Sequence, residues 1–238
     1  MGFDKENGLR AALVELSNFQ IFSDLDSSTI ASLCEGGSVV LSSHREALFE
    51  AGAQAKYFGV VLSGAYKLSR PSPNGDDTII HFSTPGDVVG AFIMAQDNPK
   101  FPVTARAMGP SRFLKIPREN YCSRWKERPE LIIKIQNLLS NRMTQMHIAK
   151  TMQRSTLSAK VAALLIDLVN RETESKDEAI LPLPLTRKEI ADNLGSSVES
   201  VIRVMSEWSK QGLIETNDQH IKILKVDKII NEIGDGSL

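Results

Sequence analysis

The sequence predicts an α+β protein that combines an antiparallel, jelly-roll-like β-roll, a long helix and a C-terminal winged helix-turn-helix. Short apolar runs with regularly spaced glycines over residues 39–116 predict the roll. An unbroken helical pattern from residue 131 to about 156 predicts the long helix, and two short helices followed by a hairpin within residues 185–224 predict the winged motif. The predicted borders are 1–128 for the roll with its N-terminal helices, 129–157 for the long helix and 158–238 for the winged domain.

The length and composition are those of a soluble globular protein with one large core or two modest cores. The 238 residues are 42% hydrophobic and 24% charged, and no apolar run is long enough to span a membrane or to form an N-terminal leader. Cys34 and Cys122 are too few for a disulfide framework or for the four thiolates of an iron–sulfur cluster. We therefore expect a cytoplasmic protein without an iron–sulfur cluster and without a membrane partner.

The first 116 residues change from a helical pattern to a strand pattern. Residues 9–35 are predicted to be helical, with a break near 23–28. Glycines then recur at intervals of 12, 11 and 11 residues: Gly52, Gly64, Gly75 and Gly86. Asn74-Gly75 is a strong hairpin signal. The predicted strands are residues 39–41, 47–49, 57–62, 66–68, 78–82, 103–107 and 113–116.

Pro129 is predicted to open the long helix, because the amide hydrogen that proline lacks has no helical partner at this position. The apolar stripe of this helix is wide enough for burial on two sides. It includes the polar residues Arg142 and Gln145, which we interpret as part of a ligand site. The remaining predicted segments are a helix at about 158–169, a charged loop at 172–178, an edge strand at 180–185 and a terminal helix at 225–233.

Residues 185–212 carry the signals of two helices joined by a tight turn. Thr186 and Glu189 form a predicted capping box, Gly195 ends the first helix, and Ser196 or Ser197 caps the second. Four apolar residues share one face of the second helix and are predicted to point inward: Val201, Val204, Met205 and Trp208.

Glu199 and Arg203 lie four residues apart on the outward face of that second helix. Arginine can donate two hydrogen bonds to guanine O6 and N7 in the major groove, and glutamate can accept one from the cytosine amino group. A hairpin over residues 213–224, with its turn at Asn217-Asp218, is the predicted wing. This arrangement predicts sequence-specific binding of double-stranded DNA.

The charge of the helix-turn-helix favours a different reading. Residues 186–212 contain four cationic and four anionic side chains, so the basic surface that is usual in DNA-binding domains is missing. A module that binds a partner other than DNA therefore stays open as an alternative.

The order of these parts resembles the CRP/FNR family of bacterial transcription regulators. Besides the helix-turn-helix, the resemblance rests on LSG at 62–64 and on TPGDVVGAFIMAQDNPKFPVTARAMGPSRFLKIP at 84–117, which is similar to the phosphate-binding cassette of a cyclic-nucleotide-binding domain. The resemblance implies that the roll is a sensor, that the long helix forms a homodimer and that two recognition helices bind a palindromic duplex. It also implies RNA polymerase as a partner.

The cassette departs from the cyclic-AMP-binding pattern of the family. Members that bind cyclic AMP contact the ribose through a glutamate and the phosphate through an Arg-Ser pair, and these positions are Ala91 and Phe101-Pro102 here. The helix hydroxyls that contact adenine fall on Met146 and His147, and only Arg142 remains of the polar contacts. Because a cyclic phosphate is costly to bury without a cation, we expect a small effector other than ordinary cyclic AMP. The predicted effector pocket comprises Val89, Gly90, Ala91, Phe92, Phe101, Pro102, Val103, Arg142, Met146 and His147.

The recognition helix follows the family more closely. The family reads a TGA core through a glutamate and an arginine four residues apart, and Glu199 and Arg203 match these positions. Val198 matches the FNR-like arrangement, Ile202 stands where relatives often have serine or glycine, and Arg187 matches an arginine that contacts phosphate. The predicted DNA-binding residues are Arg187, Lys188, Ser196, Ser197, Val198, Glu199, Ser200, Ile202 and Arg203.

Two alternatives to an effector-controlled regulator stay open. One is a constitutive DNA-binding dimer in which the cassette serves only as scaffold. The other is a haem-based sensor of redox state or gas, with His147 as the candidate ligand. The four histidines show no metal-ligand spacing, so we predict no metal site: His44, His81, His147 and His220. No catalytic motif is present, so we do not expect an enzyme.

Overall fold

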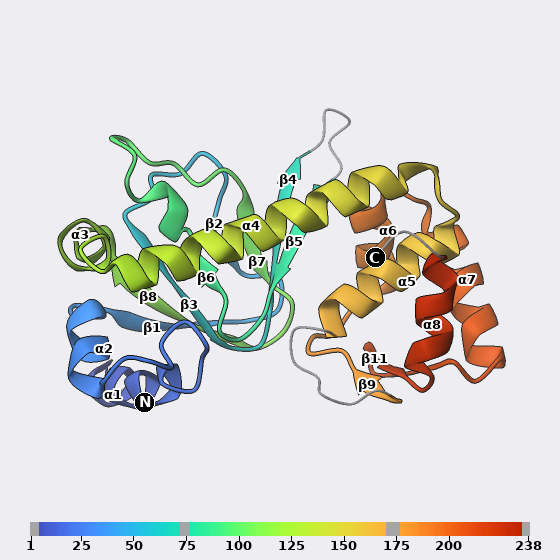
Figure 1. Ribbon diagram of the computed structural model, residues 1–238, viewed down its shortest axis with the longest axis horizontal. Helices are drawn as coiled ribbons and strands as arrows, with labels where there is room; N and C mark the ends of the chain where they lie inside the picture. The colour runs from blue at the N-terminus through green and yellow to red at the C-terminus, as the bar shows by residue number, and fades with distance from the viewer. Residues whose placement is uncertain (1–4, 72–76, 170–176, 235–238) are drawn as a thin grey trace. The chain divides into compact units, whose positions relative to one another are not determined.

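The computed structural model describes residues 5–71, 77–169 and 177–234, and Figure 1 shows the order of its elements. The chain forms two compact units. Among the described residues, the first contains 5–71 and 80–140, and the second contains 77–79, 141–169 and 177–234. The predicted α+β architecture of β-roll, long helix and winged helix-turn-helix is confirmed, whereas the three borders drawn from the sequence stay predictions.

The roll consists of two four-stranded sheets with the strand orders β1-β8-β3-β6 and β2-β7-β4-β5. The strands are β1 (Ser38–Ser42), β2 (Ala47–Phe49), β3 (Tyr57–Ser63), β4 (Tyr66–Pro71), β5 (Asp77–Ser83), β6 (Val88–Val89), β7 (Thr104–Ala107) and β8 (Ser111–Pro117). All seven strands predicted for the roll are present, whereas the edge strand predicted at 180–185 is reduced to Ala179–Ile180. β6 escaped prediction because two residues are too few for an alternating pattern to be recognised. The predicted turn at Asn74-Gly75 lies outside the described residues.

Four helical segments lie at the sheet that contains β1, β8 and β3 (Figure 1). They are α1 (Lys5–Leu16), α2 (Ser27–Leu33), α3 (Arg118–Asn120) and the π-helical turn η2 (Tyr121–Trp125). α1 and η2 contact the strands of this sheet, α2 contacts α1 and η2, and α3 contacts η2. Trp125 is fully buried, and its ring meets Phe22 and Phe58 edge-on. Its Nε1 donates a hydrogen bond to the carbonyl oxygen of Leu33 (3.1 Å), so the polar edge of the ring is satisfied while the rest is buried. This contact fastens η2 to the end of α2.

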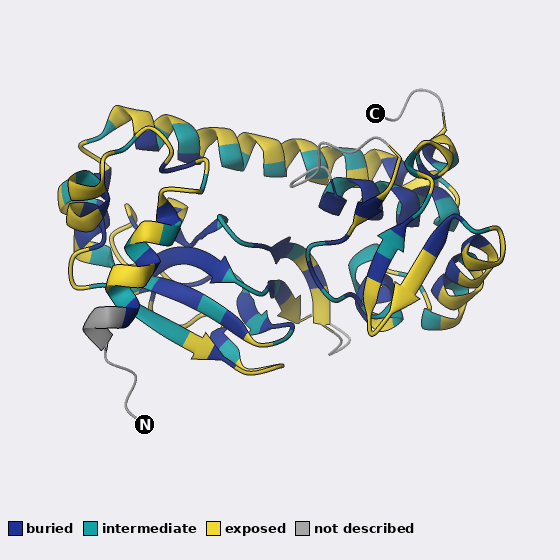
Figure 2. Cartoon of the chain, turned by 90° about the horizontal axis from the view of Figure 1, so that it is seen from below, coloured by how far each residue is buried: buried dark blue, intermediate teal, exposed yellow. Residues whose placement is uncertain are grey.

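α4 (Pro129–Thr151) begins at the predicted proline and passes into a 3₁₀ turn, η3 (Met152–Arg154), before the predicted end near residue 156. In the first unit, Leu131 and Ile135 of α4 are buried in the core of the roll. Exposed residues nevertheless run along much of the helix (Figure 2). In the second unit, the Gln145 side chain donates a hydrogen bond to the Asp167 carboxylate of α5 (Leu157–Val169). Gln145 therefore has a partner within the protein, which the sequence did not indicate.

The second unit contains, besides α5, the helices α6 (Arg187–Leu194), α7 (Val198–Lys210) and α8 (Val226–Ile233). Its three-stranded sheet has the order β10-β11-β9, formed by β10 (Ile214–Asn217), β11 (His220–Ile223) and β9 (Ala179–Ile180). α8 packs against α5, which gives the predicted terminal helix a structural role. Leu165, Trp208 and Ile229 are among the side chains buried in this unit.

The hairpin of β10 and β11 confirms the predicted wing but corrects its turn. The sequence placed the turn at Asn217-Asp218, whereas Asn217 pairs with His220 across the ladder. The turn is therefore Asp218-Gln219, one residue later. Both residues have positive φ (46° and 67°), as a two-residue turn of type I′ requires.

Gly59 in β3 tests the packing of the roll. A Cβ at this position would lie 1.8 Å from the carbonyl oxygen of Leu114 in β8. Relief of this clash would require the backbone of β8 to shift, which is energetically costly. We expect Gly59→Ala to lower the free energy of unfolding by about 3 kcal/mol or more, measured by urea denaturation. Gly109→Ala is the matched control, because its Cβ would meet no atom within 4 Å. Equal stability of the two variants would contradict this packing.

Candidate DNA-binding site

The first helix of the helix-turn-helix is held in place at both ends. At the start of α6 the side-chain oxygen of Thr186 accepts from the Glu189 amide (3.1 Å), and the Glu189 carboxylate accepts from the Thr186 amide (3.0 Å). The predicted capping box is thereby confirmed. At the other end Gly195 adopts the left-handed conformation (φ 61°), which a side chain would disfavour. The turn into α7 is therefore set by local sequence.

α7 presents one face to the core and the other to solvent. Ser197, rather than Ser196, is its cap and accepts from the Ser200 amide (3.2 Å). Three of the four predicted core residues are buried, Val201, Met205 and Trp208, while Val204 is half-buried. Glu199 and Arg203 are exposed, as predicted.

The other predicted DNA-binding residues divide by exposure. Ser196, Val198 and Ser200 are half-buried, and Ile202 is 47% exposed. Lys188 is exposed and forms an ion pair with Asp192 of α6 (3.1 Å). Part of the positive charge at the start of the motif is therefore neutralised within the protein.

Arg187 connects α6 to the wing. Its Nη2 donates a hydrogen bond to Thr216 Oγ1 of β10 (2.9 Å). Burial lowers the pKa of Arg187 from its ordinary value, but a guanidinium remains protonated at neutral pH. The sequence suggested only a phosphate contact for Arg187, whereas the structure adds a second task, the positioning of the wing. Thr216 is the partner that sequence reasoning missed, because no local pattern joins residues 29 positions apart.

The cassette keeps the backbone of a ligand loop but fills it with aromatic rings. Gly90 has a positive φ (85°) and precedes the 3₁₀ turn η1 (Ala91–Ile93). Phe101 is buried and stacks on Phe49 with 3.8 Å between ring centroids, and its ring lies 5.5 Å from that of Tyr57. A Cβ on Gly90 would come within 3.3 Å of the Phe101 ring. The Phe101 side chain is therefore part of the core of the roll.

The ten residues of the predicted effector pocket lie in both units. In the first unit Val89, Gly90, Ala91 and Phe101 are buried, Val103 is half-buried, Phe92 is 42% exposed and Pro102 is exposed. In the second unit, on the later part of α4, Arg142 is half-buried, and Met146 and His147 are exposed.

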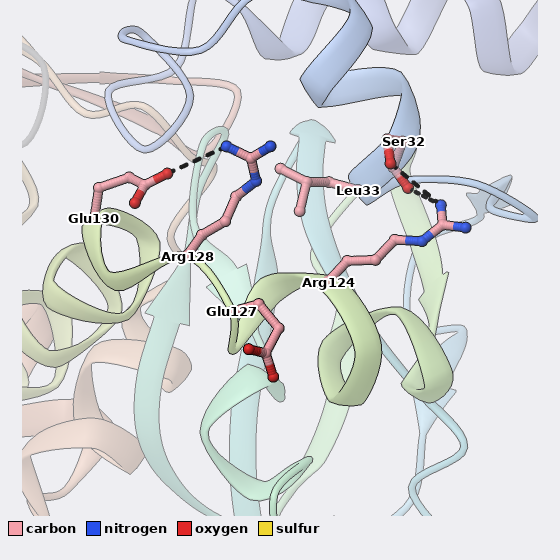
Figure 3. A pocket seen from close by; sticks show the side chains of 6 residues that line it. All are labelled: Ser32, Leu33, Arg124, Glu127, Arg128 and Glu130. Atoms are coloured by element: carbon pink, nitrogen blue, oxygen red, sulfur yellow. Dashed lines mark hydrogen bonds and ion pairs between the residues drawn. The ribbon is translucent and has the colours of Figure 1, made fainter.

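A pocket of about 390 Å³ lies elsewhere in the first unit, where α2, η2 and the start of α4 meet (Figure 3). It is lined by Ser32, Leu33, Arg124, Glu127, Arg128 and Glu130. Arg124 donates to the Ser32 carbonyl oxygen and pairs with Glu35, and Arg128 pairs with Glu130 (3.4 Å). Both arginines already have carboxylate partners, so the pocket offers no uncompensated positive charge to an anion.

Two family models match the chain. The model of the Crp-like helix-turn-helix domain matches residues 159–231, and the model of the cyclic nucleotide-binding domain matches residues 42–122. Together they define a DNA-binding transcription regulator with a sensor-like β-roll.

Curated relatives agree. Transcriptional activator protein FnrA of Stutzerimonas stutzeri is 28% identical over 181 residues, which are 75% of this chain and 73% of the relative. Nitrogen fixation regulation protein FixK of Bradyrhizobium diazoefficiens is 28% identical over 197 residues, 82% of this chain and 81% of the relative. The structure of FixK2 from Bradyrhizobium japonicum has the same fold, with a TM-score of 0.70 at 20% identity over 82% of this chain and 96% of that chain. The chain belongs to the CRP/FNR family, whose members named here are transcription regulators and not enzymes.

The described part of the chain, residues 5–71, 77–169 and 177–234, contains neither a candidate membrane span nor a candidate metal cluster. Within these ranges no helix has both the length and the hydropathy that crossing a membrane requires. Nor do these residues bring three or more His, Cys, Asp or Glu side chains together in an arrangement able to hold a metal ion.

The filled cassette leads to a prediction about cyclic AMP. Phe101 occupies core space and supplies no hydrogen-bond donor for a phosphate. A ligand raises the melting temperature only if it binds the folded state. We therefore expect cyclic AMP at about 1 mM to leave the melting temperature unchanged. Differential scanning calorimetry measures this, with 5′-AMP as the control for general phosphate effects. A saturable rise in melting temperature specific to cyclic AMP would contradict the prediction.

Proposed function

We propose that the protein is a homodimer that regulates transcription by reading a palindromic DNA site with two copies of α7. The observation that carries the proposal is the exposed pair Glu199 and Arg203 on a helix whose opposite face is buried. Among the described residues neither side chain has a hydrogen bond or ion pair to satisfy it. Arg203 can therefore present its guanidinium to guanine O6 and N7, while Glu199 accepts from cytosine N4.

The balanced charge of the helix-turn-helix favours binding through specific contacts and not through general electrostatic attraction to DNA. The helix-turn-helix lacks an excess of cations, so we expect weak non-specific binding. Two linked recognition helices compensate, because binding of the second becomes effectively intramolecular. Arg187, at the start of α6 and bonded to the wing, is placed to contact a backbone phosphate with the donors that Thr216 does not use.

The exposed side of α4 supports dimer formation. Ile132, Leu139 and Met146 form a row with seven-residue spacing, which is the repeat of a two-stranded coiled coil. Ile132 and Leu139 are half-buried and pack in part against the core of the roll, whereas Met146 is exposed. Met143 and Met146 are each 60% exposed and Ile133 is 55% exposed, so apolar surface is left uncovered in the single chain. A helix of 23 residues extends about 35 Å, enough for a substantial interface. In this proposal RNA polymerase is the further partner of the DNA-bound dimer.

Binding of a small effector stays a prediction, and the aromatic side chains of the cassette favour a second candidate function. Phe49, Phe101 and Tyr57 fill the cassette in the manner of a structural core, which supports a constitutive DNA-binding dimer. An effector other than ordinary cyclic AMP is the alternative. A haem sensor would use the exposed His147, and a Soret band after haem reconstitution that is lost in His147→Ala would support it.

Removal of the Arg203 guanidinium tests base reading. We expect Arg203→Ala to lose about 1–3 kcal/mol of preference for the G·C pair, because a two-pronged contact to guanine disappears. Competition binding after selection from randomised sites measures the loss. Lys210→Ala removes an exposed cation from the last turn of the same helix and is the matched control, expected to leave the preference unchanged. The same preference in Arg203→Ala as in the parent protein would refute the proposed reading.

A charge on the exposed side of α4 tests the dimer. Met146→Glu places a carboxylate in each copy at the proposed interface, and burial of these unpaired charges is unfavourable. We expect the variant to be monomeric at concentrations where the parent is dimeric, by sedimentation equilibrium. Val14→Glu, at a 72% exposed position of α1, should leave the dimer intact. A dimeric Met146→Glu protein would exclude this side of α4 as the interface.

A further inference from the structure

Residues 131–166 carry five cationic side chains and no acidic side chain, although the whole chain is nearly neutral, with 28 cations against 29 anions. The five residues lie on α4, η3 and α5: Lys134, Arg142, Lys150, Arg154 and Lys160. Base reading by α7 does not account for this one-sided charge, because the stretch ends before the helices α6 and α7 begin. The positive charge of these residues therefore needs another explanation.

Three of the five cations have partners within the protein. Lys134 is paired with a carboxylate, Lys160 donates to a backbone carbonyl oxygen, and Arg142 takes part in a further interaction. Lys150 and Arg154 differ from these three. Both are exposed, and neither side chain has a hydrogen bond or an ion pair to another described residue. Their charge is available to a partner from outside the single chain.

The helical repeat fixes the side of α4 on which Lys150 lies. Spacings of four and three residues alternate along this side, which is the pattern of the a and d positions of a coiled coil. The members of the row are Ile132, Gln136, Leu139, Met143, Met146 and Lys150. Lys150 follows Ile132 by 18 residues, which is about five helical turns, so the two residues lie on the same side. Lys150 is therefore the charged member of the row on which the proposed dimer depends.

A lysine in this row meets its own twin. In a parallel dimer each member of such a row lies opposite the same residue of the other copy, across helix axes that are about 8–10 Å apart. This separation is about one Debye length at 0.1 M salt, so screening does not remove the repulsion between the two ammonium groups. The residues three and four positions from Lys150 carry no negative charge that could compensate: Met146, His147, Gln153 and Arg154. The twin lysines therefore weaken the dimer unless an anion neutralises them.

The number and type of donors indicate which anion fits. A dimer contains two Lys150 and two Arg154 side chains, so 2 + 2 = 4 positive charges gather near the end of α4. A single halide ion does not balance this charge, whereas an anion with several phosphate groups does. Lysine binds phosphate as a compact point charge, and arginine can donate two parallel hydrogen bonds to it. The donors therefore favour a compact oligophosphate.

We infer that two copies of the chain together form a binding site for a small anion with two or more phosphate groups, between their Lys150 side chains at the C-terminal end of α4. The inference rests on the proposed dimer, since a single copy supplies only half of the site. A bound anion stabilises the dimer because it binds the dimer and not the separate chains. The site thus makes the pairing of the two α7 helices depend on the concentration of the anion, without a ligand in the cassette.

Pyrophosphate is the probe, and the readout is dimer formation by the full-length protein without DNA, measured by sedimentation equilibrium. We expect saturating pyrophosphate to lower the dissociation constant of the dimer by about tenfold, the shift that a ligand produces at about ten times its own dissociation constant. Sodium chloride at the same ionic strength should have a smaller effect. Lys150→Met should form a tighter dimer than the parent without pyrophosphate and should lose the pyrophosphate response. Equal effects of the two salts, or a response that persists in Lys150→Met, would overturn the inference.

A charge exchange tests whether the two lysines face each other. Mixed with the parent protein, Lys150→Glu should form more heterodimer than random mixing gives, measured by native mass spectrometry, because the exchange turns repulsion into attraction. Lys228→Glu, at an exposed position of α8, is the matched control and should mix at random. Random mixing of Lys150→Glu together with a monomeric Met146→Glu protein would overturn the anion site while the proposed dimer stands. A dimeric Met146→Glu protein would overturn both.

Discussion

The burial of one face of α7 is the constraint on which the recognition surface depends. Val201, Met205 and Trp208 are 3% exposed or less, and each contributes about 1.5–3 kcal/mol by leaving water. An exposed pair of charges four residues apart on a helix contributes only a few tenths of a kcal/mol. The rotation of α7 about its own axis is therefore decided by the buried face. Glu199, Ile202 and Arg203 point outward as a consequence.

Two of the acidic side chains in the helix-turn-helix have partners within the motif itself. Formally its cations and anions balance, but the Glu189 carboxylate is buried in the capping box and Asp192 is paired with Lys188. These two acids are engaged within α6, so they do not belong to the outward face of α7. α7 itself carries two acids and two bases, Glu199 and Glu207 against Arg203 and Lys210, so its outward face depends on placed contacts and not on an excess of positive charge. The capping box also shows how a carboxylate can stabilise a helix start without facing the DNA.

The cassette has the backbone turn of a ligand-binding loop but not the side chains that bind cyclic AMP in the family. Gly90, with its positive φ, keeps a sharp turn before η1, and the chain around it keeps the family's fold. By resemblance to members that bind cyclic AMP, Ala91 falls at the position of the ribose-contacting glutamate and Phe101 at that of the phosphate-contacting arginine, and the Phe101 ring is stacked in the core. The backbone geometry of this turn is set locally by Gly90.

The sequence alone determined the class of fold, the capping box, the left-handed Gly195 and the outward pair on α7. These features depend on residues within one or two helical turns of each other, which a pattern can register. The same holds for most strands of the roll, whereas β6 was too short to be seen and the wing turn was placed one residue early. Only the tertiary structure decided that Arg187 bonds to Thr216, that Gln145 is held by Asp167 and that Phe101 stacks on Phe49. Each of these contacts joins residues more than 20 positions apart, and their distance in space is set by how whole elements pack, which the periodicity of a single segment does not contain.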